Sequence, residues 1–491
     1  MLRARLACLV LLLVGPAAVL GDEAEPVPPP AVDAAPDPAP DPAPAAAPAV
    51  VDFPARPRRV LVEMDVAGEL FAAAGKDLTV RRPISVEARF DFVEEQSAGP
   101  AAAGRVYAAA SAVLRIDGEA AATALAEDAR RVAVVLRGTT PVPYLDEGFL
   151  SRDEADLLEL PFDSLLVDRL VPDGPVEAGA KWTIPGNVTA GMLAIDTIES
   201  GSLDATVDAV DGGLATVRFA GILDGAVDGA ATHLVVEGEC SGPATAAAGG
   251  WRLEPPRTLA VTIRERRQAG HVAPGLDVTA GLRISRRPAA SAGPPPAVAA
   301  GGTRRRGDGR PGLVWSRDRE GRYDLVHDAR WKLVEDGAHG LVMRLVDHGA
   351  LVAQCSVTAL PRGDGVAAPT IAEVQRDVER SLAGQFGRFI AAAESSRSDG
   401  LRIVRLVSEG TAETLPFHWI HYVLTDAEGR RAAATFMLEA KAAERFAAAD
   451  RDMIDGFAFL AAASPPAGPA AAREGAFPDR EARAPRGTVQ P

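Results

Sequence analysis

The chain is poor in the residue types from which many catalytic and metal sites are built. Of its 491 residues, only 5% are aromatic, 3 are cysteine and 7 are histidine. No C-x-x-C pair occurs, which excludes a metal site built on paired cysteines. Cys240 and Cys355, the cysteines beyond residue 21, fall in different predicted domains, so a disulfide framework is excluded. We expect both to be small buried hydrophobes.

Common catalytic motifs are also missing. The sequence contains no G-x-S-x-G, H-E-x-x-H or G-x-x-x-x-G-K-[ST] pattern, and its Asp-Gly pairs lack the ligand order of a calcium loop. We therefore assign no catalytic, cofactor-binding or metal-binding residue and no cofactor, and expect no enzymatic activity. A hydrolase stays an open alternative, because two separated carboxylates are enough for glycoside hydrolysis and a sequence cannot show where they meet.

The charge balance is acidic. Lys and Arg number 52 against 67 Asp and Glu, which gives a formal net charge of −15. Such a surface is unsuited to nucleic acid, whose binding depends on basic groups that neutralise phosphates, and equally to anionic lipid. The apolar fraction of 47% is enough to bury sizeable cores, and the length exceeds that of one typical domain.

The N-terminus has the pattern of an export signal. Arg3 and Arg5 precede an apolar run, Leu6 to Leu20, which ends at Gly21 before two acidic residues. The run is shorter than the ~20 residues that a membrane-spanning helix needs. We expect residues 1–21 to be a signal peptide and the protein to be periplasmic or extracellular, with no stable membrane span after cleavage. An uncleaved N-terminal anchor is the alternative.

Three low-complexity segments divide the remaining chain. Residues 22–50 form a Pro/Ala-rich tether, residues 287–312 a linker rich in Pro, Gly and Arg, and residues 462–491 a tail of similar composition. All three are predicted to be disordered or extended. They leave two folded bodies, at 51–286 and 313–461. Within the linker, the run Arg304-Arg305-Arg306 indicates either a protease-sensitive site or a local anion contact.

The first body, 51–286, reads as a series of β-strands. Apolar and polar residues alternate through Val60–Val66 and Ile84–Phe90, and β-branched residues are frequent. The clearest hairpin turns at Asp211-Gly212-Gly213, where Asp-Gly supplies the positive φ of a tight turn. The regular spacing of the strands predicts an antiparallel β-meander, either a curved sheet or a half-barrel.

The second body, 313–461, mixes strands and helices. Thr370 and Glu373 form a capping box, followed by apolar residues at helical spacing that continue to Phe386, Phe389 and Ala393. A last helix is predicted to place Phe446, Met453, Phe457 and Leu460 on one face. Strands are predicted at 323–327, 341–345, 351–360, 401–407, 417–424 and 431–439. The predicted fold class is α+β, with an antiparallel sheet packed by at least two helices.

The second body resembles the PsbP-like fold group. The resemblance rests on the order of a strand, Trp331, a long Ala-Gln-Cys strand, the capped amphipathic helix, the Trp419-x-x-Tyr422 hairpin and a final helix. It covers 313–461 only and includes no catalytic signature. It implies a largely non-enzymatic domain that docks to other proteins. The first body resembles uncharacterised exported bacterial β-rich domains, and neither resemblance assigns a functional residue.

Two of the seven histidines lie close together in the stretch FHWIHY, residues 417 to 422. If this stretch is a strand, His418 and His421 point to opposite faces and cannot bind one ion. We therefore interpret the stretch as a central strand of the second sheet and not as half of a metal site. The remaining histidines are predicted to be solvated or simply hydrogen-bonded; they are His233, His271, His327, His339 and His348.

Together these features predict an exported, non-catalytic binding or assembly protein of the cell envelope that acts through protein surfaces. The first alternative is a carrier of a lipid or other apolar small molecule in the concavity of the β-rich body. The second is a hydrolase with a carboxylate site that has no recognisable motif. A protein partner in the envelope is compatible with the first interpretation, and nucleic acid is excluded as a partner.

Overall fold

The computed structural model describes residues 57–73, 79–96, 102–270, 272–290, 304–305, 307–338, 340–361 and 368–460. The predicted signal peptide, tether and tail lie outside these residues. Among the described residues, no helix is long and apolar enough to cross a membrane. The structure confirms the predicted fold class: one large antiparallel sheet, two smaller sheets and short helices.

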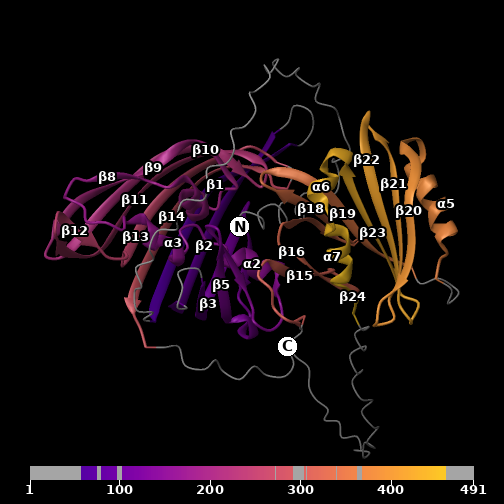
Figure 1. The fold of residues 1–491 in the computed structure, drawn as a ribbon, viewed down its shortest axis with the longest axis horizontal. Helices are drawn as coiled ribbons and strands as arrows, with labels where there is room; N and C mark the ends of the chain where they lie inside the picture. The colour runs from indigo at the N-terminus through magenta and orange to yellow at the C-terminus, as the bar shows by residue number, and fades with distance from the viewer. Residues whose placement is uncertain are drawn as a thin grey trace, which may run out of the picture.

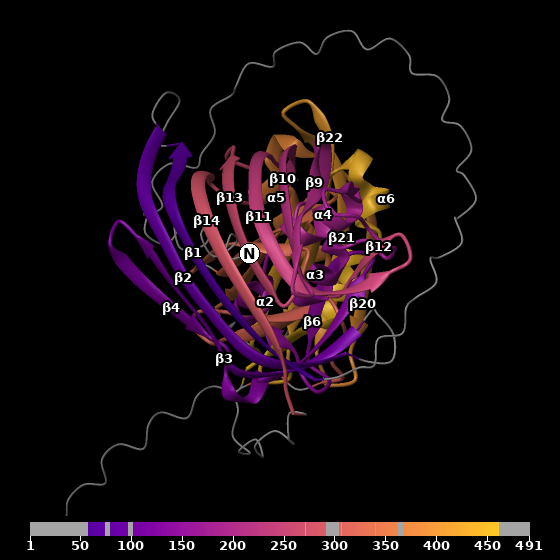
Figure 2. The same cartoon turned by 90° about the vertical axis from the view of Figure 1, so that its left-hand side faces the viewer.

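The first body is built on a 13-stranded antiparallel sheet that curves around a concave inner face (Figures 1 and 2). Its strands run in the order β6-β5-β3-β2-β1-β14-β13-β11-β10-β9-β8, with β12 paired to β11 and β4 paired to β3. The strand bounds are β1 Arg58–Ala73, β2 Thr79–Gln96, β3 Ala102–Ile116, β4 Glu119–Ala124, β5 Arg131–Arg137, β6 Thr140–Tyr144, β8 Lys181–Ile184, β9 Thr197–Asp211, β10 Leu214–Val227, β11 Ala230–Ala247, β12 Gly250–Leu253, β13 Thr258–Arg267 and β14 Gly275–Pro288.

Three short helices lie on the concave face of this sheet: α2 (Arg152–Leu158), α3 (Ser164–Val167) and α4 (Gly186–Leu193). Their apolar side chains join the inward-facing residues of the strands in one continuous core. Ser151 begins α2 with a capping box, in which its hydroxyl accepts from the Glu154 amide and the Glu154 carboxylate accepts from the Ser151 amide. These helices exclude water from the apolar side chains that the strands direct to the inner face.

A small four-stranded sheet joins the two bodies. Its order is β24-β16-β15-β7, where β7 is Leu150–Ser151, β15 is Leu313–Arg317, β16 is Tyr323–Asp328 and β24 is Phe457–Phe459. Strand β7 precedes α2 in the first body, and it pairs in parallel with β15. The two bodies therefore share backbone hydrogen bonds.

The second body contains a seven-stranded antiparallel sheet covered on both faces (Figure 1). Helix α5 (Ile371–Leu382) packs on one face through Val374 and Val378, while α6 (Ala443–Phe446) and α7 (Ala449–Asp455) pack on the other. The strands run in the order β17 (Trp331–Gly337), β18 (Gly340–Asp347), β19 (Ala350–Leu360), β23 (Arg431–Glu439), β22 (Leu415–Thr425), β21 (Arg402–Ala412) and β20 (Phe386–Ser396).

Two helices of the second body are shorter than the sequence predicted. The helix after Thr370 ends at Leu382, and residues 386–396, predicted to continue it, form strand β20. Ala383 leaves the helix at φ +47, and the following residues pair with β21 instead. The last helix is likewise interrupted at Ala447, with φ +49, and Phe457 belongs to β24. The apolar positions that suggested helical periodicity instead serve an edge strand, where Phe386 and Phe389 pack against each other.

A buried polar network fixes α7 to the second sheet. Asp450 on α7 is almost fully buried, and its carboxylate accepts hydrogen bonds from the Tyr422 hydroxyl at 2.7 Å and from Nε of Arg405 at 2.9 Å. Arg405 Nε also lies 2.9 Å from the Tyr422 hydroxyl oxygen. Every member therefore has a partner, as a buried charge requires.

We expect Tyr422→Phe to lower the free energy of unfolding by about 1–2 kcal/mol, because Asp450 loses a buried hydrogen bond that no water replaces. Urea unfolding followed by circular dichroism measures this. Tyr144→Phe, which removes a hydroxyl from the first body, is the matched control and should cost less than about 0.5 kcal/mol. Equal effects of the two substitutions would contradict the role given to the network.

Candidate functional site

The structure does not bring the histidines together. Strand β22 is regular, so His418 and His421 lie on opposite faces, with His421 on the face that α5 covers. His327 is buried, with Nε2 2.9 Å from the Ser316 hydroxyl and Nδ1 2.9 Å from the backbone carbonyl of Asp328. His271 and His339 lie outside the described residues. Among the described residues, no group of three His, Cys, Asp or Glu side chains could hold a metal ion.

Burial keeps two of these histidines neutral. It lowers the pKa of both His327 and His421 to about 4. His421 Nδ1 lies 3.2 Å from the Thr435 hydroxyl, while its buried Nε2 has no hydrogen-bond partner. Both cysteines are free and buried, and burial raises the pKa of Cys240 to about 12, which makes it unreactive at neutral pH.

These histidines should make stability depend on pH. Their folded-state pKa of about 4 lies below the ordinary 6.5, so their contribution is complete above pH 6.5 and is lost as pH falls towards 4. His421→Gln should reduce the loss of stability between pH 6.5 and pH 4 by about 2 kcal/mol. Urea unfolding at both pH values measures the difference. His418→Gln, on the opposite face and half-exposed, should keep the wild-type pH profile.

The linker arginines are anion contacts. Arg304 donates from both terminal nitrogens to the Glu154 carboxylate, at 2.7 and 2.8 Å, and to Asp128 at 2.7 Å. Arg305 forms an ion pair with Asp324 of β16 in the second body. The Gly307 carbonyl then accepts from the Gly148 amide. Gly307 to Gly312 happens to match G-x-G-x-x-G, but it leads into strand β15 and not into a helix, so it is no dinucleotide motif.

We expect Arg304→Met to release this segment, because it leaves the carboxylates of buried Glu154 and partly buried Asp128 without this cation. Hydrogen exchange of the Gly309 amide, which donates to the Asp146 carbonyl, should become at least about tenfold faster. Arg310→Met is the control, since that side chain is exposed. Unchanged exchange at Gly309 in a folded Arg304→Met protein would contradict the assignment.

A cleft of about 650 Å³ lies where the two bodies meet. Its walls come from β5 and β6, α2 and the residues after it, the end of α4 with the residues up to Asp196, the β10–β11 turn and, from the second body, residues of β15 to β18. Apolar side chains, among them Leu158, Ile195 and Val227, line one part. Charged side chains line the rest. The volume falls within the range of small-molecule sites in proteins.

Contacts between charged and polar groups cross the cleft. Nζ of Lys332 on β17 lies 3.1 Å from Asp228 in the β10–β11 turn. Arg152 on α2 forms a two-bonded ion pair with Asp156 and donates to the backbone carbonyls of Ala329 and Trp331. Burial acts to raise the pKa of Asp228, but the charge of Lys332, its hydrogen bond and the charge of Arg267 contribute to lowering it to about 2. Both members of this pair are therefore charged at neutral pH.

Two other carboxyl groups line the cleft: Glu159 and Asp196. Burial raises the pKa of Glu159, and the negative charge of Asp156 acts in the same direction. Burial and the nearby charge of Asp228 raise the pKa of Asp196. Perturbed carboxyl groups gathered in a concave site mark a candidate functional site.

An apolar cluster lies on the same inner face of the first sheet, at the ends of four adjacent strands. The cluster is separate from the main core, and of the described residues it contains only strand side chains. Its buried members are Leu70, Ile84, Val86, Leu114, Ile116, Leu276 and Val278. We call it the strand-end cluster.

The strand-end cluster and the cleft are linked through β13. Arg267 and Glu265 are buried on β13, opposite Leu276 and Val278 of the cluster. The charge of Arg267 also contributes to the low pKa of Asp228 in the cleft. Apolar and charged surfaces therefore adjoin on one face. Sequence reasoning predicted the concavity but missed the cleft, because no motif links Glu159, Asp196, Asp228 and Lys332.

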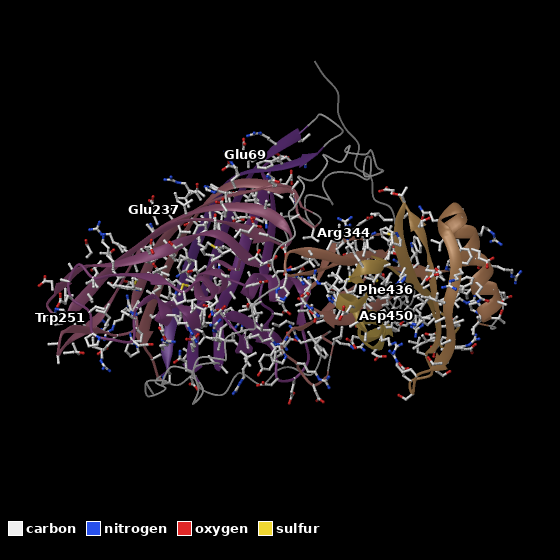
Figure 3. The ribbon with its side chains drawn as sticks, turned by 45° about the horizontal axis from the view of Figure 1, so that its top comes forward. Glu69, Glu237, Trp251, Arg344, Phe436 and Asp450 are labelled. Carbon is white, nitrogen blue, oxygen red and sulfur yellow. The ribbon has the colours of Figure 1, made fainter. Side chains whose placement is uncertain are left out.

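A second hollow crosses the outer face of the first sheet. This trough, of about 1040 Å³, extends over β8, β9, β10, β11, β13, β14 and β1, and Glu237 lies beside it on the outer surface (Figure 3). Charges of both signs line it, including Lys181, Arg218, Asp204 and Glu239. Phe436 and Asp450, by contrast, lie inside the second body.

No family model matches the chain, and no curated protein matches it. Among the solved structures that are distantly similar to the chain are cyanobacterial PsbP and lipovitellin. Cyanobacterial PsbP from Synechocystis sp. PCC 6803 is 16% identical over 30% of this chain and 93% of that chain, with a TM-score of 0.26. A lipovitellin structure, described as showing lipid–protein interactions, is 7% identical over 50% of this chain, with a TM-score of 0.27. This chain spans 26% of that lipovitellin chain.

Proposed function

We propose that the protein is an exported, non-catalytic binding protein that holds an amphiphilic small molecule on the inner face of its first body. The apolar part of the ligand lies on the strand-end cluster, and the polar head lies in the cleft between the bodies. The observation that carries this proposal is the strand-end cluster itself, an apolar group apart from the main core and beside a charged cleft.

The arrangement of the inner face supports this proposal. Helices α2, α3 and α4 contribute apolar side chains to the main core, and none of those side chains belongs to the strand-end cluster. The seven side chains are aliphatic and buried against one another, and an acyl or alkyl chain that inserts among them gains roughly 0.8 kcal/mol for each methylene buried. The charged cleft lies one β-strand away, so a ligand with one apolar and one polar end suits both.

A second candidate function is docking of a protein partner in the cell envelope. The outer trough supports it, because it offers a concave surface with charges of both signs to a complementary partner. We also propose that the second body belongs to the PsbP-like fold group, which its element order around Trp331 and Trp419 supports. The two candidate functions use opposite faces of the first sheet and can be tested separately.

The test of the ligand-binding proposal measures binding of the fluorescent apolar probe N-phenyl-1-naphthylamine to the exported protein. Leu276→Gln, which places an amide in the strand-end cluster, should weaken binding at least about tenfold. Val86→Thr introduces a hydroxyl at nearly equal volume and should weaken probe binding less. It is the second test variant, to be used if Leu276→Gln does not fold. Ile222→Gln is the control, since Ile222 is 59% exposed on the outer face.

Unchanged probe binding in folded Leu276→Gln and Val86→Thr proteins would contradict the proposal. Native mass spectrometry of the exported protein gives a second readout, because a carrier should retain a small molecule from the host. If residues 1–21 are still attached and the probe binds only after their removal, the segment itself competes for the site. That outcome supports the apolar site and shows that export must precede loading.

A further inference from the structure

The cleft contains more acidic than basic side chains. Its lining includes seven carboxyl groups and five basic groups. The carboxyl groups are Asp156, Glu159, Asp163, Asp196, Asp228, Asp328 and Asp347, and the basic groups are Arg105, Arg137, Arg152, Arg330 and Lys332. The charge of a ligand has to complement those charged groups of the cleft that form no ion pair within the protein.

Most of these charges neutralise each other inside the protein. Five of the carboxyl groups form ion pairs with four of the basic groups. The pairs are Asp163 with Arg105, Asp156 with Arg152, Asp228 with Lys332, and both Asp328 and Asp347 with Arg330. The fifth basic group, Arg137, is exposed at the rim and donates to the Pro311 carbonyl.

Two of the seven carboxyl groups, those of Glu159 and Asp196, are in none of these ion pairs. Asp196 accepts hydrogen bonds from the backbone amides of Asp228 and Gly229, which gives it a role in holding the β10–β11 turn. Glu159 has no ion-pair partner among the described residues. The positive charges of Lys332 and Arg152 act on Glu159, but these two side chains are already paired with Asp228 and Asp156. The carboxyl group of Glu159 is thus the acceptor that the cleft offers to a ligand.

We infer that the head group bound in the cleft is cationic, an ammonium group placed against Glu159. This inference rests on the proposed function and specifies its ligand: an amphiphile with a positively charged head and an alkyl or acyl chain. An ammonium head makes a charge-assisted hydrogen bond or ion pair in a partly dehydrated site, where such contacts are strong. A carboxylate or phosphate head would instead face the unpaired carboxyl group.

Burial of Glu159 supports this choice. Burial raises the pKa of Glu159 more than the charges of Lys332 and Arg152 lower it, and an ammonium ligand brings a further positive charge to this carboxyl group. In this proposal the alkyl chain runs from the cleft across β13 towards Leu276 of the strand-end cluster, and it displaces the buried side chains of Arg267 and Glu265 on the way. From β11 to β14 this path crosses two strand spacings, about 10 Å, which a ten-carbon chain spans.

The test compares three ligands with the same ten-carbon chain: decyltrimethylammonium, decanoate and decyl glucoside. Isothermal titration calorimetry of the exported protein, below the micelle concentrations, should give the tightest binding for decyltrimethylammonium, at least about tenfold above decanoate. Glu159→Gln should weaken decyltrimethylammonium about tenfold and leave decyl glucoside unchanged. Glu127→Gln, which changes a carboxyl group with a side chain 90% exposed, is the matched control.

The outcomes separate the inference from the proposed function. Tighter binding of decanoate, or equal ammonium binding by wild type and Glu159→Gln, overturns the cationic head group and leaves the apolar site standing. If none of the three ligands binds, the proposed function falls as well. If Glu159→Gln does not fold, Glu159→Asp keeps the test open, because it retains the charge but withdraws the carboxylate by one methylene and should weaken only the ammonium ligand.

Discussion

The rest of the structure depends on how the inner face of one curved antiparallel sheet is covered. A sheet of 13 strands presents a row of apolar side chains along each strand, and this face has to be buried. The chain meets this requirement with short helices inserted between β7 and β9 instead of a second sheet. Because α2, α3 and α4 are short, their side chains reach only part of the face. The strand-end cluster is buried without a side chain from these helices, and the cleft lies beside α2.

Buried ion pairs determine where these helices sit. Arg105 on β3 is almost fully buried, yet it bonds to both oxygens of Asp163, at 2.6 and 2.8 Å, and to Glu94 at 2.9 Å. Asp163 is also the N-cap of α3 and accepts from the Leu165 amide. A buried pair of this kind adds little net stability, but breaking it is costly, so it fixes one position of the helix over the sheet. The position of α3 in turn determines how much of the inner face of the first sheet the helices cover.

The sequence predicted the architecture better than the site, and the reasons are physical. Strand alternation and Asp-Gly turns are local signals, so the hairpin at Asp211 and the strand at His418–His421 appear in the structure as predicted. The helix predicted to reach Ala393 ended early because apolar spacing at Phe386 and Phe389 also suits an edge strand. The cleft needs Glu159, Asp196, Asp228 and Lys332, which only the tertiary fold brings together. Nothing in their spacing could have revealed it.

The way in which the two bodies meet explains why a cleft persists between them. An apolar junction would close, because burying more surface would stabilise it further. This junction is instead held by polar contacts that have fixed lengths: Lys332 with Asp228, Arg152 with two backbone carbonyls, and Arg304 with Glu154. Such contacts orient the bodies while contributing little net energy. In the proposed function, a cationic group placed in the remaining space gains more than an apolar one, since Glu159 lines the cleft and has no ion-pair partner among the described residues. The polar contacts that keep the cleft open therefore also favour the cationic ligand that we propose for it.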